Sequence, residues 1–578
     1  MKRYFSAIIV LLASVVAVQA QSTSGLLFNR DILPASSILS LSQRESAGTA
    51  RSMAMGGAFT SLGADMASLG VNPAGFGMYK RNEISVTFGT GVTQAKNYNA
   101  YNDGNNINTR FVINNVGSSA QLYEGTGKLT AVNIAFGYNK VADFNYDMNY
   151  HSLPSVSSLA DAFADIANAN GLLINSDNKI ADDRGYYDYD MNPYYWGTVL
   201  GYKGGLINRD KNGWYPDEIA PGAQMSQYTN LKSRGSAGEF SFAVGFNFSN
   251  IVYLGASLDI QSISRKQTIH YSEYISYAGA RPDAAAYPYQ LQEFRFGQSM
   301  QIDGSGVGAK FGLVVRPTKG LRIGFAVHTP SYYSLAYRYE GWLSSDALSV
   351  GDNPYGWEVK NGFVYADERT PILQDGGANR WKFATPTRLL AGISYAFGPY
   401  AVISTDYEYD AYRSLKMKGI PTDPGYSDDA FRDNLRGVHT IRAGVEVKPL
   451  PWLALRAGGG YKSHIMRGKR NKDGIYNYDY DFLQFGEPVN DTSWYVSTGV
   501  GFRLGKVTSI DLAYQYINSR YTDYYSFYTQ IGNIPNRDFM TIIDTLRFID
   551  IKFSKQNNHT ECVTHLTDHT GQSDYSVL

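Results

Sequence analysis

Alternation of apolar residues with polar or small residues runs through much of this chain and limits the folds open to it. In the stretch VGAKFGLVV, Val307 and Phe311 fall on one side of an extended chain and Lys310 falls on the other. The same period of two recurs over residues 439–447 and 494–504. A strand with this pattern has one apolar face and one polar or small face. Repeated this often, the pattern predicts an all-β protein.

The N-terminus and the composition indicate an exported membrane protein. Residues 1–20 combine Lys2 and Arg3 with a short apolar run, which predicts a signal peptide cleaved after Ala20. The single cysteine, Cys562, excludes a disulfide within the chain. After the signal peptide, no apolar run approaches the roughly 18 residues of a spanning helix. The 14% aromatic residues and 58 glycines then favour a β-barrel in the outer membrane of a Gram-negative envelope.

Charge and motif content exclude several other classes of protein. The 52 Lys and Arg residues balance the 52 Asp and Glu residues, so we expect no nucleic-acid partner. The chain lacks the metalloprotease, phosphate-loop and serine-hydrolase motifs. His270, His328 and His464 are not at metal-ligand spacing. We therefore expect no enzymatic activity, no cofactor and no metal site.

Short and long connections alternate along the chain. Tight turns occur at 124–128, 249–251, 316–320, 397–400, 448–452 and 504–507. Longer polar connections rich in Gly, Asn and Tyr lie between them. Short periplasmic turns and long external loops are typical of an outer-membrane barrel. Six turns and seven loops connect fourteen strands, so the sequence predicts a fourteen-stranded antiparallel transmembrane β-barrel over residues 81–553.

The segments on either side of the predicted barrel differ from it. Residues 21–80 are rich in Ala, Met and Gly, and their apolar content argues against a solvated tail. We therefore expect an N-terminal hatch, a small helical plug inside the barrel. Residues 554–578 form a polar tail without a strand pattern. This tail is either a native extension or the product of an altered reading frame.

The longest external loop, residues 141–237, contains a candidate ligand groove. Apolar residues at helical spacing in SLADAFADIANANGLLI and the aromatic residues of MNPYYWG could line it. Alternatively, the helix only folds the loop onto the barrel. The candidate groove residues are Leu159, Phe163, Ile166, Tyr194, Tyr195 and Trp196.

Charged residues on the inward side of the predicted strands must be paired or hydrated, because unpaired buried charge is costly. We single out Asp406, Glu408, Arg442 and Arg456. One interpretation is an ion-pair network that holds the hatch. The other gives an arginine such as Arg442 or Arg456 the role of meeting a ligand carboxylate.

Four stretches of the chain resemble one known family. Residues 52–89, 308–330, 385–417 and 439–463 are similar to the FadL/OmpP1/TodX family of outer-membrane transporters for hydrophobic compounds. The resemblance implies a fourteen-stranded barrel with an N-terminal hatch. It also implies passive entry, with capture of the ligand at external loops and lateral release through the barrel wall. The implied ligands are long-chain fatty acids or similar amphiphiles.

The resemblance also assigns a position to the sequence LGVNPAGFGM. It implies that Asn72, Pro73, Ala74 and Gly75 end the hatch where it meets the wall, close to the exit. A second interpretation is that these residues only turn the chain into the first strand. The partners expected are a hydrophobic small molecule or fatty acid, outer-membrane lipid and the barrel-assembly machinery, with the chain a monomer. The alternative function is a secretion or surface-assembly partner on the same fold, whereas a hatch argues against an aqueous porin.

Overall fold

The computed structural model describes residues 35–522 and 549–555, apart from short gaps. The gaps are 46–47, 97–104, 152–157, 193–194, 218, 220–222, 278–288, 350–358, 361–362, 373–380, 419–428, 468, 471–475, 478–488 and 506. The predicted signal peptide, the first residues of the hatch, and nearly all of the polar tail lie outside the described residues. The final strand ends at Lys555, two residues beyond the predicted end of the barrel.

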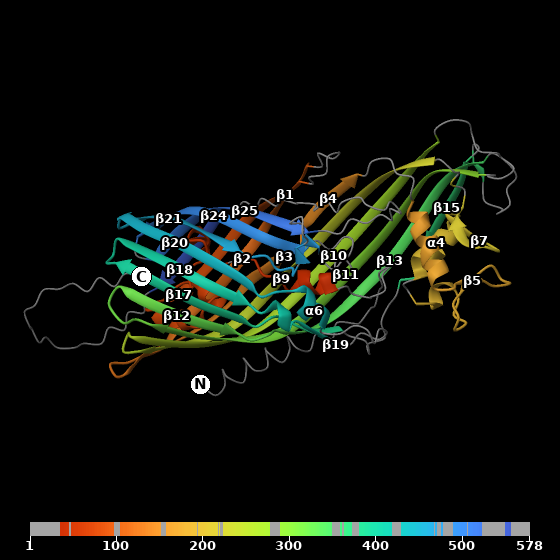
Figure 1. Ribbon diagram of the computed structural model, residues 1–578. Coiled ribbons are helices and arrows are strands. Elements are labelled where there is room, and N and C mark those ends of the chain that lie inside the picture. Colours follow the sequence, from red (N-terminus) through yellow and green to blue (C-terminus); the bar gives the residue numbers. More distant parts are fainter. Residues whose placement is uncertain are drawn as a thin grey trace, which may run out of the picture.

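Antiparallel strands dominate the structure, as the alternation predicts (Figure 1). Each main strand hydrogen-bonds to its neighbours in one large sheet, and the last strand pairs with both β25 and β1. The strands of this sheet, in pairing order, are β1 (Asn82–Lys96), β2 (Asn105–Glu124), β3 (Leu129–Asp143), β9 (Ala223–Phe248), β10 (Val252–Tyr277), β11 (Tyr289–Val315), β12 (Leu321–His328), β17 (Arg388–Phe397), β18 (Ala401–Asp410), β20 (Val438–Leu450), β21 (Leu453–Lys462), β24 (Val489–Leu504), β25 (Thr508–Thr522) and β26 (Ile549–Lys555).

The other strands extend this sheet or stand apart from it. The strands β4 (Tyr146–His151), β13 (Tyr332–Ser349), β14 (Val359–Lys360), β15 (Phe363–Arg369), β16 (Trp381–Ala384) and β19 (Lys416–Lys418) belong to the large sheet. Three separate hairpins are β5 (Leu173–Ile174) with β6 (Ile180–Ala181), β7 (Ile207–Asp210) with β8 (Gly213–Pro216), and β22 (Lys469–Arg470) with β23 (Tyr476–Asn477). Among the residues that the structure describes, no helix is long and apolar enough to cross a membrane.

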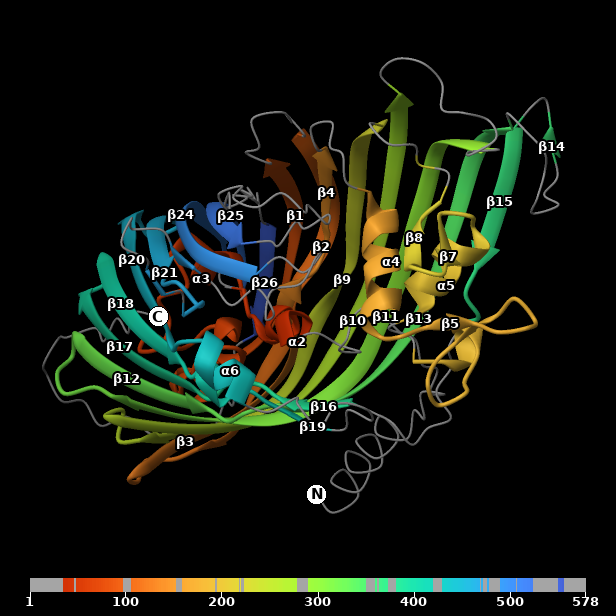
Figure 2. The same ribbon diagram turned by 45° about the vertical axis from the view of Figure 1, so that its right-hand side comes forward.

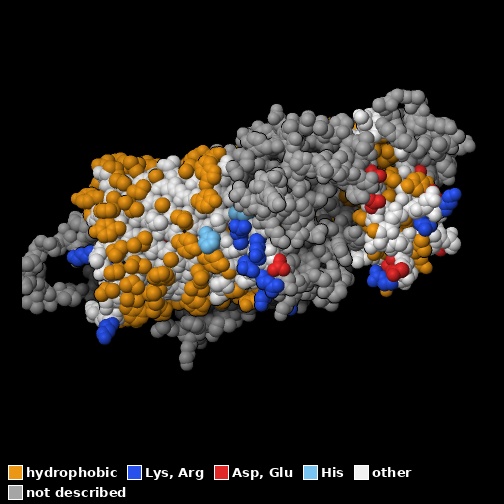
Figure 3. Space-filling view, viewed as in Figure 1, with side chains coloured by type: hydrophobic (Ala, Val, Ile, Leu, Met, Phe, Trp, Pro, Cys, Tyr) orange, Lys and Arg blue, Asp and Glu red, His pale blue; other side chains and the backbone are white. Residues whose placement is uncertain are grey.

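The outer face of the sheet is apolar and the inner face is polar. Val307 and Phe311 are 51% and 54% exposed, whereas Lys310 between them is 1% exposed. Ile441 and Trp494 are likewise exposed on β20 and β24. Figure 3 shows the exposed apolar side chains as a broad band near one end of the molecule. Apolar residues outside and charged residues inside reverse the usual order of a water-soluble protein, as expected of a wall that faces lipid.

The two ends of the sheet differ. All six predicted tight turns join consecutive strands at one end, which we call the turn end (Figure 1). Strand β10, which reaches the other end, is 26 residues long, more than twice the roughly 9–11 residues that cross a bilayer. The parts of β9, β10, β11 and β13 at that end therefore extend well beyond the apolar band, as a comparison of Figure 1 with the same view in Figure 3 shows.

The N-terminal segment, residues 35–81, lies inside the curve of the sheet (Figure 2). It contains α2 (Ala35–Ser42), α3 (Ala50–Ala54) and two 3-10 helices, η1 (Met66–Leu69) and η2 (Pro73–Met78). Its apolar residues pack against small residues of the wall. Met66 and Phe76 contact Ala135 and Ala243, and α3 packs against Ala513.

The remaining helices belong to the connections at the end opposite the turns. Helix α4 (Leu159–Ala169) and helix α5 (Trp196–Lys203) lie with β7 and β8 against the extended strands (Figure 2). Nearby are η3 (Asp188–Asp190), η5 (Tyr412–Ser414) and α6 (Asp429–Asn434). A second apolar cluster joins α2 to this end, where Ile38 and Leu39 pack with Trp196, Tyr339 and Phe431.

Candidate functional site

The Asn72–Gly75 turn is fixed by hydrogen bonds and close packing. Asn72 is 1% exposed, and its Oδ1 caps η2 by accepting from the Ala74 N–H at 3.0 Å. Its Nδ2 donates to the Thr60 carbonyl at 2.7 Å. Longer contacts of 3.4 and 3.3 Å join the same Nδ2 to the carbonyls of Leu313 and Phe325 in β11 and β12. Asn72 therefore connects the N-terminal segment to the wall as well as turning the chain.

Glycines of the wall allow the N-terminal segment to approach its backbone directly. A Cβ at Gly255 would lie 2.2–2.4 Å from backbone atoms of Pro73 and Ala74. A Cβ at Gly312 would lie 1.8 Å from Asn72 Oδ1. Equivalent contacts within 2.5 Å occur at Gly245, Gly324, Gly444 and Gly458. Backbone-to-backbone contact around the lumen leaves little space between the N-terminal segment and the wall.

A side chain of the neighbouring strand β3 also holds the end of η2. The Nδ2 of Asn133 on β3 donates to the carbonyls of Phe76 and Tyr79 at 2.7 and 3.0 Å. A hydrogen bond to a buried carbonyl is costly to remove, since the carbonyl then loses both its partner and water. The chain therefore leaves the N-terminal segment and enters β1 at a fixed position.

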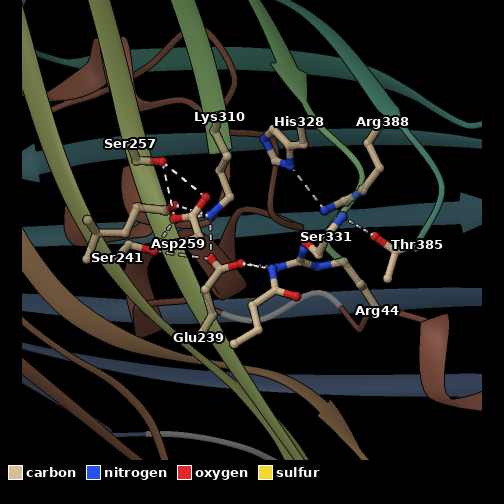
Figure 4. Close-up of polar contacts among 12 residues, drawn as sticks. Arg44, Glu239, Ser241, Ser257, Asp259, Lys310, His328, Ser331, Thr385 and Arg388 are labelled. Atoms are coloured by element: carbon tan, nitrogen blue, oxygen red, sulfur yellow. Dashed lines mark hydrogen bonds and ion pairs between the residues drawn. The ribbon is translucent and has the colours of Figure 1, made fainter. Parts of the chain in front are cut away.

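A buried ion-pair cluster lies next to η1. Its residues come from the adjacent strands β9, β10 and β11 (Figure 4). The Lys310 ammonium pairs with Glu239 and, at 2.9 Å, with Asp259. It also donates to the Leu69 carbonyl at 2.9 Å. Arg44 of the N-terminal segment pairs with Glu239 at 2.7 Å. Two separate parts of the N-terminal segment, at Arg44 and at Leu69, are thus joined to the same ion-pair cluster.

The predicted lumen charges lie in two further clusters. Glu408 pairs with Arg388 and, at 2.6 Å, with Arg442. Arg456 pairs with Glu446 at 2.5 Å and with Asp511 at 2.6 Å.

Two of these groups reach the N-terminal segment. Glu446 also accepts from Arg51 of α3 at 3.0 Å, and Asp406 accepts from the Thr60 N–H at 2.7 Å. These contacts fit an ion-pair network that holds the N-terminal segment. Arg442 and Arg456 are both engaged with carboxylates of the chain, which leaves the ligand-carboxylate interpretation without support from their contacts.

The predicted external groove residues divide between two apolar clusters. Phe163 packs edge-on against Phe296 of β11 at 5.6 Å, with Leu159 at the margin of the same cluster. Trp196 instead packs with Tyr189 and Tyr339 in the cluster that includes α2. Tyr195 lies at the margin of the Phe163 cluster. Tyr194 lies outside the described residues.

Helix α4 forms where the spacing predicts it, and its buried face is made largely of alanines. The buried residues are Ala160, Phe163, Ala164 and Ala167, whereas Leu159 and Ile166 are half-buried. Alanines allow the helix to lie close to the extended strands, and the larger residues are displaced to the flanks. Sequence spacing alone does not distinguish these faces, since alanine is apolar enough for either.

The first turn of α4 is attached to β10 by a buried carboxyl group. Ser158 and Asp161 form a capping box, and the Leu159 N–H donates to Glu273 Oε2 at 3.1 Å. The Tyr271 hydroxyl donates to the same oxygen. Glu273 lies 21 residues along β10, beyond the apolar band, and is fully buried. Burial raises the pKa of Glu273 to about 7.

The wall contains an interruption that the sequence interpretation did not locate. β2 pairs with β1 over nearly its whole length, but with β3 only from Asn115 onward, opposite Asn139. Asn114 is the extra residue of a bulge and is 1% exposed, and among the described residues neither polar atom of its side chain has a hydrogen-bond partner. Above it, Arg110 pairs with Asp143 across the space between β2 and β3. The doublet Asn114–Asn115 breaks the alternation and is the signal that could have located the bulge.

An apolar groove of about 900 Å³ opens on the outer face at this interruption. Exposed side chains from β2, β3 and β9 line it, and Phe111 is 67% exposed. The residues that line it include Phe111, Ile113, Phe136, Phe240, Lys140 and Asp143. The groove therefore joins the apolar outer face to buried charged groups of the wall. Among the described residues, no group of three or more His, Cys, Asp or Glu side chains could hold a metal.

Comparisons with known proteins find similarity only among solved structures. No family model matches the chain, and no curated protein matches it. The toluene transporter TodX of P. putida aligns with a TM-score of 0.45 and 13% identity, covering 89% of this chain and 99% of that chain. The CymD monoaromatic hydrocarbon channel aligns with a TM-score of 0.42 and 12% identity, covering 89% and 98%.

A FadL homologue of Pseudomonas aeruginosa also aligns, with a TM-score of 0.42 and 12% identity, covering 88% of this chain and 98% of that chain. At these identities and TM-scores, the similarity does not decide what this chain carries. These solved structures include hydrocarbon channels and a FadL homologue, the family that four stretches of the sequence resemble.

Proposed function

We propose that this chain forms a closed fourteen-stranded barrel in a Gram-negative outer membrane and allows hydrophobic compounds to enter passively. The pairing of β26 with both β25 and β1 supports closure. The exposed apolar band supports insertion in lipid, where a closed sheet leaves no unpaired edge. The uneven ends support an orientation with the turn end in the periplasm.

The observation that carries this function is the combination of a filled lumen with an interrupted wall. The N-terminal segment acts as the hatch, held by backbone contacts at Gly255 and Gly312 and by the ion pairs of Lys310 and Glu446. The apolar groove at the β2–β3 interruption provides a route from the lumen into the membrane. A hydrophobic compound that leaves sideways avoids exposure to water, which costs about 25 cal/mol per Å² of apolar surface.

In this proposal, long-chain fatty acids or similar amphiphiles are captured at the external end. The apolar residues of α4, α5 and α2 line the approach, and Asn114, Asn115 and Asn139 lie at the exit. The side chain of Asn114, which has no hydrogen-bond partner in the part of the chain that the structure describes, contacts the passing ligand. The Asn72–Gly75 turn holds the hatch closed and does not itself move.

Uptake of labelled hydrophobic compounds by cells that lack their own transporter tests the proposal. The probes are a long-chain fatty acid and toluene, measured separately. We expect Asn114→Trp, which places a large side chain in the exit, to reduce uptake strongly. Asn114→Ala keeps the exit open and should transport like the wild type. Ile441→Trp, on the outer face of β20, is the matched control for a new tryptophan in the wall.

Heat-modifiable gel migration verifies that each variant has assembled. Uptake of toluene but not of the fatty acid would exclude fatty acids as the substrate and would still support the proposed route through the β2–β3 interruption. Uptake of neither compound by an assembled wild-type barrel would reject transport of these compounds and favour the secretion or surface-assembly alternative. Equal uptake by the wild type and Asn114→Trp would reject the β2–β3 exit.

A further inference from the structure

A second hollow lies at the turn end, on the periplasmic side of the N-terminal segment in the proposed orientation. Its volume is about 1010 Å³. It is bounded by Leu62 and Met78 of the N-terminal segment and by the wall turns at 250–251, 316–320 and 398. We call it the turn-end vestibule. It is separate from the β2–β3 groove, with which it shares no lining residue.

The charges that line the turn-end vestibule are unbalanced. Its charged residues are Arg51, Lys80, Arg316, Lys319 and Arg322, with Glu446 as the single carboxylate. Glu446 is already engaged by Arg51 at 3.0 Å and by Arg456 at 2.5 Å. Among the described residues, Lys80, Arg316, Lys319 and Arg322 form no ion pair. Figure 3 shows Lys and Arg side chains, and no Asp or Glu side chains, at this end of the visible face.

Arg322 is the most constrained of these cations. It is the second residue of β12, and its Nη1 donates to the Leu62 carbonyl at 2.8 Å. Its Nε is buried and has no hydrogen-bond partner among the residues that the structure describes. The hydroxyl of Ser394, the residue opposite it on β17, is also buried and has no partner within the same described ranges. A guanidinium presents five donors in a planar fork, and burying it without an anion is costly.

Apolar side chains line part of the turn-end vestibule, and the polar residues Asn247, Asn250 and Thr318 line another part. Leu62, Met78, Ile251, Tyr253, Tyr395 and Val402 line it together with the cations. A free inorganic anion would leave this apolar surface uncovered. An anionic head group on an apolar chain would satisfy the cations and cover the apolar surface at the same time.

We propose that the turn-end vestibule binds the anionic head group of an amphiphile, a carboxylate or phosphate monoester on an apolar chain. Arg322 contacts the anion from inside the hollow, and Arg316 and Lys319 contact it from the 316–320 turn. This inference depends on the proposed function only for the orientation that lets ligand enter from the periplasm. It gives the chain an anion site that the lateral route does not use.

Calorimetric titration of the purified full chain in nanodiscs of uncharged lipid tests the inference. The probes are tetradecanoate, tetradecyl phosphate, tetradecanol and inorganic phosphate. We expect the two anionic amphiphiles to bind, and Arg322→Gln to weaken both at least about tenfold, because a charged hydrogen bond is lost. Arg322→Lys keeps the charge and should retain most of the affinity. Arg209→Gln removes an exposed cation in β7 and is the matched control.

Equal binding of tetradecanol, or binding of the anionic amphiphiles that Arg322→Gln leaves unchanged, would overturn the inference. If inorganic phosphate binds as tightly as tetradecyl phosphate, the apolar chain contributes nothing to binding. That result would overturn the proposal that the ligand is an amphiphile and would leave a simple anion site. If Arg322→Gln does not assemble, the double variant Arg316→Gln with Lys319→Gln on the turn gives the same test. Toluene uptake separates the two proposals, since transport without vestibule binding rejects this inference alone, and binding without uptake rejects transport alone.

Discussion

The substitution Asn72→Asp tests whether the Asn72 side chain holds the N-terminal segment against the wall. Aspartate is as good a helix N-cap as asparagine, so the bond to the Ala74 N–H is kept. The substitution also replaces Nδ2, which donates to the Thr60 carbonyl at 2.7 Å, with an oxygen that faces the same carbonyl. The new carboxyl group can donate there only when it is protonated.

The cost of the substitution follows from this need for a proton. An ordinary aspartate has a pKa of about 3.9, so keeping the carboxyl protonated at pH 7 costs about 4 kcal/mol. Near pH 4 this cost nearly disappears, because the carboxyl is already half protonated. Asn72→Ala loses the cap, about 1 kcal/mol, and leaves the Thr60 carbonyl unpaired, about 1–3 kcal/mol, at either pH. The two variants therefore differ in pH dependence.

Ion conductance across a planar bilayer measures the effect, because displacement of the N-terminal segment opens the lumen. We expect Asn72→Asp to conduct much more at pH 7 than at pH 4, and the wild type to conduct little at both. Asn72→Ala should conduct at a level that does not change with pH. Equal conductance of Asn72→Asp at the two pH values, or a pH dependence of Asn72→Ala like that of Asn72→Asp, would refute the reasoning.

Three other substitutions probe the remaining contacts. Gly255→Ala should lower the unfolding midpoint by crowding the Pro73–Ala74 backbone, at a cost of about 1–3 kcal/mol, whereas Gly127→Ala, with open space around it, should not. Lys310→Met should lower the free energy of unfolding in denaturant by about 3–5 kcal/mol, because Glu239 and Asp259 lose their shared cation. An unchanged unfolding midpoint would contradict this. Glu273 has a raised pKa in the folded state, so its contribution to stability is greatest below pH 4.5 and is lost as pH rises to about 7, by about 3 kcal/mol in all. The protection factors of the α4 amides in hydrogen exchange, which correct for the intrinsic rise in exchange rate with pH, should therefore fall over that range and should not do so in Glu273→Gln.

Much of the wall could be predicted because its signals are local. Along a strand between lipid and a polar interior, apolar and polar side chains must alternate. The faces on which Val307, Lys310 and Phe311 lie can therefore be predicted without knowing which strands are their neighbours. The tight turns likewise follow from short runs such as RPTKG at 316–320, which join β11 to β12 as expected. The helix at residues 159–169 was predictable from its spacing, although its buried face was not.

The contacts inside the lumen could not be predicted, because they join residues far apart in the chain. Gly255 and Gly312 look like ordinary strand glycines until Asn72 and Pro73 lie against them. The β2–β3 interruption depends on where the pairing of these two strands ends, at Asn115, and the bulge at Asn114 beside it shifts the register of β2 against β1 by one residue.

The sequence by itself determined that this chain has strands with an apolar outer face, six tight turns at one end, and an apolar segment before the first strand. It also identified the Asn72–Gly75 turn and charges that must be satisfied inside. Only the tertiary structure decided which charges are paired and which, such as Arg322, have no carboxylate partner among the described residues. The reason is physical, since alternation reflects the environment of each residue alone, whereas a pair, a close approach or a hollow depends on which distant strands become neighbours.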